Sequence, residues 1–272
     1  MTQEERNALQ RWAEHHKALA ADVPVEDWLS QSEIDKKRKK LEEDPIKWIK
    51  YFFPKYAKYE FAPFHVRAIK RVIEHDEWYE VLSWSRELAK STVAMFICMY
   101  LALTKRKRFF VLASATIDSA KRLLAPYKIN FESNPRIRQF YGSQVTLGQW
   151  TDGEFTAKCG AKFVALGAGS APRGARNEEV RPDVIYMDDY DTDEDCRNPE
   201  TLKKKWDWFE ASLYPTRSIS EPTLILWCGN IIAKDCCIKR AGAKAKHWDI
   251  VNIRDKDGHS TWPAKNTEEQ ID

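Results

Sequence analysis

The segment SWSRELAKST, residues 83–92, decides how the rest of this sequence is interpreted. It follows an apolar pair and precedes the apolar run VAMFICMYLAL. A buried strand, a polar loop and a helix beginning near Lys90 form the arrangement in which backbone amides surround a phosphate group. The consensus for such a loop is GxxxxGK[ST], and here Trp84 and Ala89 occupy the two glycine positions. The segment therefore fits either a phosphate-binding loop without its glycines or an ordinary helix start.

If the loop binds a nucleotide, its individual residues have expected roles. Lys90 would neutralise the β and γ phosphates, and Ser91 would bind Mg²⁺. Arg86 is one candidate for the arginine that stabilises the charge developed in phosphoryl transfer. The nucleotide-binding residues expected from the loop are Ser85, Arg86, Glu87, Leu88, Ala89, Lys90, Ser91 and Thr92.

Strand and helix patterns alternate along most of the chain. Strands are predicted at 80–85, 108–116, 181–189, 222–230 and 247–255, with a hairpin around Gly160, and helices at 65–74, 90–103, 118–131 and 198–214. This alternation predicts an α/β fold with a mainly parallel sheet flanked by helices. Ligands of such sheets bind beyond the carboxyl ends of the strands. Residues 1–45 are charged and helix-prone, which predicts an N-terminal helical segment before a main domain at 46–272.

A second polar signal ends the predicted strand DVIYMDD, residues 183–189. Four apolar residues followed by two acids have the form of a Walker B strand. Asp188 would hold Mg²⁺ through water, and Asp189 would polarise the attacking water. The alternative is a solvated acidic loop, because further carboxylates crowd the region. The separation of roughly a hundred residues from Lys90, with strand–helix units between, favours a P-loop ATPase.

A third polar signal is LWCGN, which ends another predicted strand at Asn230. An amide in this position could sense a γ-phosphate, and a simple strand-end turn is the alternative. Three polar signals at the carboxyl ends of predicted parallel strands are the main structural reason to expect a nucleotide site.

Two further groups of residues have open assignments. Arg173 and Arg176, in the loop GAGSAPRGARN, are further candidates for the arginine finger, and surface solvation or contact with a neighbouring subunit or DNA is the alternative. His65, in FAPFHVRAIK, either faces an adenine ring or occupies the core or the surface.

Composition excludes some classes of protein and leaves others open. The formal net charge of +3 over 272 residues is too close to neutral to predict a nucleic-acid partner. No apolar run reaches the roughly 18–20 residues of a membrane span, so no membrane association is expected. The six cysteines lack CxxC spacing and several lie in apolar segments, which predicts a reduced, cytosolic compartment.

The order of these motifs resembles that of phage terminase large subunits, the ATP-driven motors that package DNA. SRELAKST resembles their phosphate loop, which often has the form S-R-x-x-G-K-[ST], so Ala89 rather than Trp84 is the departure. RPDVIYMDD after an Arg-Gly loop is similar to their Walker B region, and LILWCGN to their coupling motif. FAPFHVRAI is similar to their adenine-contacting segment, and STWPAKNTEEQID to a late Trp-Pro stretch.

The resemblance implies an ASCE/RecA-like P-loop NTPase that converts ATP and water to ADP and phosphate with Mg²⁺. Hydrolysis would drive double-stranded DNA into a procapsid in the host cell cytoplasm. The implied partners are a portal protein, a small terminase subunit and further copies of the chain in a ring. The family continues into a nuclease domain, so this chain is expected to be the ATPase half, without nuclease activity.

Two alternatives stay open at this point. Another nucleic-acid-dependent ATPase, such as a helicase, would be expected to carry a second RecA-like core, for which 272 residues leave no room. A degenerate domain that binds nucleotide or protein without turnover is favoured by Ala89 and by Asp189, where many ATPases have glycine and glutamate.

Overall fold

The computed structural model describes residues 14, 24–172 and 180–271. The strands are β1 (Trp78–Trp84), β2 (Phe109–Ser114), β3 (Glu154–Thr156), β4 (Lys162–Gly167), β5 (Val184–Asp188), β6 (Leu224–Cys228) and β7 (His247–Val251). They form one sheet of seven strands in the order β3-β4-β2-β5-β6-β1-β7. Every neighbouring pair is parallel except β3 with β4, which is the predicted hairpin. The mainly parallel α/β sheet predicted from the alternating pattern is therefore confirmed.

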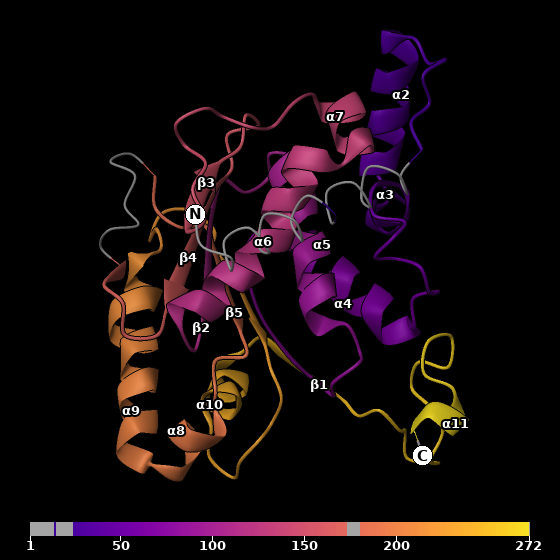
Figure 1. The fold of residues 1–272 in the computed structure, drawn as a ribbon. Coiled ribbons are helices and arrows are strands. Elements are labelled where there is room, and N and C mark those ends of the chain that lie inside the picture. Colours follow the sequence, from indigo (N-terminus) through magenta and orange to yellow (C-terminus); the bar gives the residue numbers. More distant parts are fainter. Residues whose placement is uncertain (1–13, 15–23, 173–179, 272) are drawn as a thin grey trace.

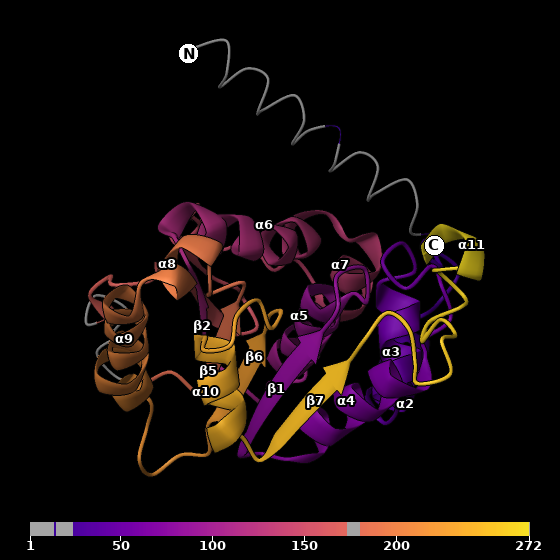
Figure 2. The ribbon, with the colours of Figure 1, turned by 90° about the horizontal axis from the view of Figure 1, so that it is seen from below.

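Helices cover both faces of this sheet (Figures 1 and 2). They are α2 (Gln31–Glu42), α3 (Pro45–Phe52), α4 (Pro63–Glu74), α5 (Lys90–Leu103), α6 (Ile117–Ser133), α7 (Pro135–Tyr141), α8 (Asp193–Arg197), α9 (Pro199–Trp208), α10 (Cys237–Lys244) and α11 (Glu268–Ile271). Alternate strand residues point to opposite faces. Leu82 and Leu226 therefore join the core formed with α3 to α7, whereas Val81 and Ile225 join the core formed with α9 and α10.

Helix α5 begins at Lys90 and ends at Leu103, as the sequence predicts. Twelve of its 14 residues are buried, because neighbouring helices and the sheet surround it. A helix that is apolar on all sides is stable only in such a central position. Its burial places the N-terminus of α5 directly at the carboxyl end of β1.

The register of three strands brings the predicted polar signals together. Cys228 at the end of β6 pairs with Leu82 of β1 on one side and with Asp188 of β5 on the other. The strand that precedes the predicted phosphate loop and the strand that ends in the two acids are thus separated by one additional strand. This order agrees with the ASCE/RecA-like class expected from the sequence.

The N-terminal helical segment is described only in part. Ser30 caps α2 together with Glu33, and Ile34 of α2 packs into the same core as α3, α4 and α5. Residues 1–13 and 15–23 of the predicted N-terminal helical segment lie outside the described residues. Within the part of the chain that the structure describes, no helix is both long and apolar enough to cross a bilayer.

The helix predicted at 198–214 differs in its second half. Helix α9 ends at Trp208, and a π-helical turn at Phe209–Leu213 follows it. This wider turn places Phe209 and Leu213 in the core beneath β5 and β6. Sequence periodicity alone does not distinguish the two helical forms, because both continue the same apolar face.

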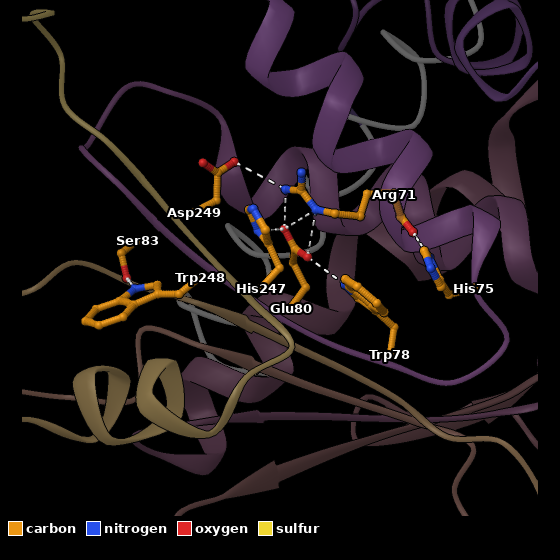
Figure 3. A network of polar contacts seen from close by, with 8 residues as sticks. All are labelled: Arg71, His75, Trp78, Glu80, Ser83, His247, Trp248 and Asp249. Atoms are coloured by element: carbon orange, nitrogen blue, oxygen red, sulfur yellow. Dashed lines mark hydrogen bonds and ion pairs between the residues drawn. The ribbon is translucent and has the colours of Figure 1, made fainter.

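A buried ionic cluster joins α4, β1 and the edge strand β7 (Figure 3). Glu80 of β1 has no exposed surface, and its carboxylate accepts three hydrogen bonds of 2.6–3.1 Å from Arg71 of α4. The Trp78 indole donates to it at 2.7 Å, and His247 Nδ1 lies 3.1 Å away. Arg71 also lies 3.6 Å from Asp249 of β7. The cluster compensates the buried charge of Glu80 in the strand that leads into the predicted phosphate loop.

We expect Arg71→Met to destabilise the fold by about 3–5 kcal/mol, because it leaves the Glu80 carboxylate buried without its main partner. Denaturant unfolding would measure the loss. Arg106→Met is the matched control: Arg106 pairs at 3.1 Å with Asp76, whose side chain is 77% exposed, so the expected cost is below about 1 kcal/mol. Equal losses in the two variants would contradict the assignment.

Candidate active site

A cavity of about 850 Å³ opens at the carboxyl ends of β1, β5 and β6. The predicted residues that line it are Arg86, Glu87, Ala89, Lys90, Ser91, Thr92, Asp189 and Asn230. A second cavity of about 400 Å³ adjoins it, shares Ser91, Thr92 and Asp189, and is also lined by Asp188. The three polar signals of the sequence therefore meet in one place.

Lys90 is a buried cation at the N-terminus of α5. Lys90 is only 8% exposed, and its Nζ donates to Asn230 Oδ1 at 3.2 Å. No described carboxylate lies within 4.0 Å of its Nζ, although Asp188 is near enough to interact with it electrostatically. A buried ammonium group with a neutral partner is incompletely compensated. Together with the α5 amides, Lys90 is therefore suited to bind an anion.

The backbone of the loop adopts the conformation for which glycine is usually required. Ala89 has φ 58° and ψ 28°, the left-handed region, and serves as the N-cap of α5 without a side-chain hydrogen bond. Glu87 also has a positive φ of 67°. A left-handed conformation costs a non-glycine residue about 1–2 kcal/mol. The loop thus retains glycine-like geometry at the one position where the sequence departs from the resembled family.

Three contacts from other parts of the chain hold this loop. The amide of Ser85 donates to Val251 O at 2.8 Å. His65 Nε2 lies 3.0 Å from Leu88 O, and Lys265 Nζ donates to Glu87 O at 2.8 Å. Contacts of this kind offset the cost of the left-handed residues.

His65 requires a correction. It has no exposed surface, so it is not available to face an adenine ring. Burial lowers the pKa of His65 to about 4, and the ring is therefore neutral at pH 7. Its Nδ1 accepts from the Ala62 amide at 3.1 Å, which leaves Nε2–H to donate to Leu88 O. His65 positions the loop instead of contacting a ligand.

Asp188 and Asp189 occupy different environments. Asp188 is 4% exposed and accepts a hydrogen bond of 2.6 Å from the Tyr186 hydroxyl. Burial raises the pKa of Asp188 to about 6, although the hydroxyls of Tyr186 and Ser91 favour its ionised form. Asp189 is exposed, has φ 41° and lines both cavities. One carboxylate is therefore fixed and buried, and the other faces the open part of the site.

The oxygen atoms of this site fit Mg²⁺. Asp188 Oδ1 is buried and has no hydrogen-bond partner among the described residues, which leaves it available to a cation. Mg²⁺ is usually bound by one or two carboxylates together with substrate phosphates and water. Within the described ranges, no cluster of three or more His, Cys, Asp or Glu side chains could hold a metal alone. Ser91 and Asp188 would thus supply the protein ligands, and a nucleotide the others.

The structure places one of the three candidate arginines at the cavity and adds two residues, Asp191 and Lys265, that the sequence did not predict there. Arg86 is exposed and lines the larger cavity, whereas Arg173 and Arg176 lie outside the described residues. Asp191 lines the cavity but caps α10, accepting from the amides of Cys237 and Ile238 at 2.8 and 2.9 Å. Lys265 lines the cavity too, and no motif in the sequence indicates this role.

No protein-family model and no curated protein matches the sequence. Among solved structures, the chain is similar to the large terminase ATPase domain of Thermus phage P74-26, with a TM-score of 0.47, and to a point mutant of that domain, with a TM-score of 0.46. Each match has 15% identity and covers 79% of this chain and 87% of the other. At this identity the likeness concerns the fold alone, and at these TM-scores it assigns no role to any residue.

Proposed function

We propose that this protein hydrolyses ATP with Mg²⁺ in the cavity at the carboxyl ends of β1, β5 and β6. The observation that carries the proposal is a buried lysine at a helix N-terminus beside a buried carboxylate whose second oxygen has no partner. Lys90 and the α5 amides bind the phosphates. Ser91 and Asp188 hold Mg²⁺, which neutralises charge on the phosphate oxygens.

The remaining residues act on the water and on the developing charge. Asp189, exposed to both cavities, orients the attacking water. Arg86 lies in the same cavity and stabilises the charge of the transferring phosphoryl group. Asn230 Oδ1 accepts from Lys90 at 3.2 Å, and its Nδ2–H group is left to donate to the γ-phosphate, so that Asn230 responds to loss of that phosphate.

The loop geometry is compatible with phosphate binding although Ala89 stands at the consensus glycine position. A methyl group at Ala89 would prevent phosphate binding if it forced the backbone out of the left-handed region. Instead Ala89 has φ 58° and ψ 28°. The departure from the glycine consensus therefore costs free energy without forcing the backbone out of the left-handed region.

We further propose that hydrolysis drives translocation of double-stranded DNA into a procapsid. The support is the order of five sequence segments, which resembles that of phage terminase large subunits. A portal protein, a small subunit that selects DNA and further copies of this chain in a ring are the corresponding partners, in the cytoplasm of a host cell. Stimulation of phosphate release by DNA together with portal protein would test this part separately.

Phosphate release from ATP is expected in Mg²⁺ and not in EDTA. Asp189→Asn should lower kcat about 100-fold or more, because the amide no longer accepts a proton from the attacking water. Its Kd for Mg·ATP should remain close to that of the wild type. Glu194→Gln removes a charge from the same acidic run outside both cavities and should leave kcat unchanged.

Two outcomes would contradict the proposal. Unchanged turnover in Asp189→Asn would mean that a residue other than Asp189 orients the attacking water. Absence of ATP hydrolysis by the wild type, even with portal protein and DNA present, would exclude the enzymatic function.

A further inference from the structure

The segment that follows β7 returns to the phosphate loop through Lys265. Lys265 Nζ donates to the Glu87 carbonyl at 2.8 Å and to its carboxylate at 2.7 Å. The Lys265 side chain is 24% exposed and lines the larger cavity. The two residues are 178 positions apart in the sequence. A cation from the far end of the chain therefore holds a backbone carbonyl of the loop that would bind phosphate.

Trp262 lies between Lys265, which holds Glu87 O, and His65, which holds Leu88 O. The Trp262 side chain is buried, and its indole donates to Glu60 O at 2.7 Å. The ring lies 4.5 Å from the His65 ring, and Lys265 Nζ lies 5.3 Å from its centre. Since His65 holds Leu88 O and Lys265 holds Glu87 O, both side chains that hold loop carbonyls pack against one tryptophan.

The segment itself is well ordered by its own hydrogen bonds. The amides of Lys265 and Asn266 donate to Trp262 O at 3.1 and 2.9 Å. Ser260 Oγ donates to Asn266 O at 2.7 Å, and the Ser260 amide donates to Glu268 at 2.8 Å. Lys265 is thus presented from a fixed turn, which we call the clamp and define as residues 260–268.

The carbonyls that the clamp and His65 hold lie in the strained part of the loop. Glu87 and Ala89 both have positive φ, and Leu88 lies between them. Without glycine, such a loop relaxes readily to other conformations, in which its amides would no longer converge on a phosphate. Holding the carbonyls of residues 87 and 88 selects the binding-competent conformation.

We infer that Lys265 is a positioning residue of the phosphate loop, and that docking of the clamp raises the affinity of the site for nucleoside phosphates. By linkage, nucleotide binding then stabilises the docked clamp by the same factor. The clamp, from a segment distant in the sequence, stabilises the loop conformation that glycine residues permit in loops with the GxxxxGK[ST] consensus. This inference rests on the proposed function, because it concerns the same site.

Calorimetry of the full chain with Mg·ADP and Mg·ATP is the first test. Lys265→Met should raise both Kd values about tenfold, because a charged hydrogen bond to the loop is lost. Lys265→Arg should recover most of the affinity, since arginine also donates to a carbonyl and a carboxylate. Lys256→Met removes the same charge from an exposed position near the clamp and should leave both Kd values unchanged.

A double variant separates positioning from direct contact with phosphate. If Lys265 acts by holding strained backbone, the double variant Lys265→Met with Ala89→Gly should bind nucleotide with a Kd at least about threefold lower than that of Lys265→Met alone. The reason is that glycine adopts the left-handed region without cost. If Lys265 contacted the phosphates, the glycine would restore nothing, and the inference would be overturned.

Hydrogen exchange provides a readout that a purely structural role would not change. Mg·ADP should slow amide exchange in the clamp of the wild type, and this slowing should disappear in Lys265→Met. A variant that loses thermal stability but keeps the wild-type Kd and the slowing would contradict the inference. Failure of the wild type to bind any nucleotide would remove the proposed function as well, whereas equal Kd values in wild type and Lys265→Met would remove only the role of Lys265.

Discussion

Replacing Lys90 with alanine is expected to lower kcat for ATP hydrolysis by at least about a hundredfold and to weaken binding of Mg·ATP. Lys90 is the buried cation of the cavity, and its Nζ already lies 3.2 Å from Asn230 at the end of β6. Charge develops on the phosphoryl oxygens in the transition state, where a fixed cation in a water-poor site is most effective. No other lysine within the described residues is placed at the N-terminus of α5.

The measurement is phosphate release at saturating ATP, with Kd determined independently. Lys107→Ala is a demanding control, because Lys107 is equally buried at 6% exposure but lies at the opposite end of the sheet. Its Nζ donates to the carbonyls of Asp76 and Pro222 at 2.8 and 2.6 Å. Lys107→Ala should therefore lower stability and leave kcat unchanged. If Lys90→Ala retained wild-type kcat, the cavity would not be the catalytic site.

Asp188→Asn is expected to stop hydrolysis and, in metal-free buffer at pH 7.5, to stabilise the fold. Burial raises the pKa of Asp188 from 3.8 to about 6. A folded-state pKa above the unfolded one means that the folded protein binds more protons between these values. Stability is therefore lost as pH rises from about 4 to 6, and above pH 6 the ionised carboxylate costs on the order of 3 kcal/mol. Asparagine carries no charge and avoids this cost.

Denaturant unfolding in EDTA at pH 4.5 and pH 7.5 would test this sign. The free energy of unfolding of Asp188→Asn should exceed that of the wild type by about 3 kcal/mol at pH 7.5, and the difference should fall to about 1 kcal/mol at pH 4.5. Addition of Mg·ADP should stabilise the wild type and not the variant, because only the wild type binds the metal. A variant less stable than the wild type at pH 7.5 would contradict this assignment. It would show that the Asp188 carboxylate stabilises the fold itself instead of being kept to bind a cation.

Much of the fold follows from local sequence. The bounds of α5 were predicted, and the carboxyl ends of β5 and β6 were predicted to within two residues, because apolar runs and polar breaks mark them directly. The meeting of Lys90, Asp188 and Asn230 was also predictable, since the carboxyl ends of parallel strands lie at one edge of a sheet. Helix α10 was not predicted, because it is short and three of its eight residues are charged.

What the sequence alone determined is therefore the α/β order of elements and the residue types of the candidate site. Only the tertiary structure decided that Ala89 adopts the left-handed region, that His65 is a buried support and that Lys265 reaches Glu87. These features depend on groups from distant segments that offset a local conformational cost. Periodicity and motifs report what a segment prefers by itself, whereas packing decides which unfavourable conformations are stabilised by the rest of the chain.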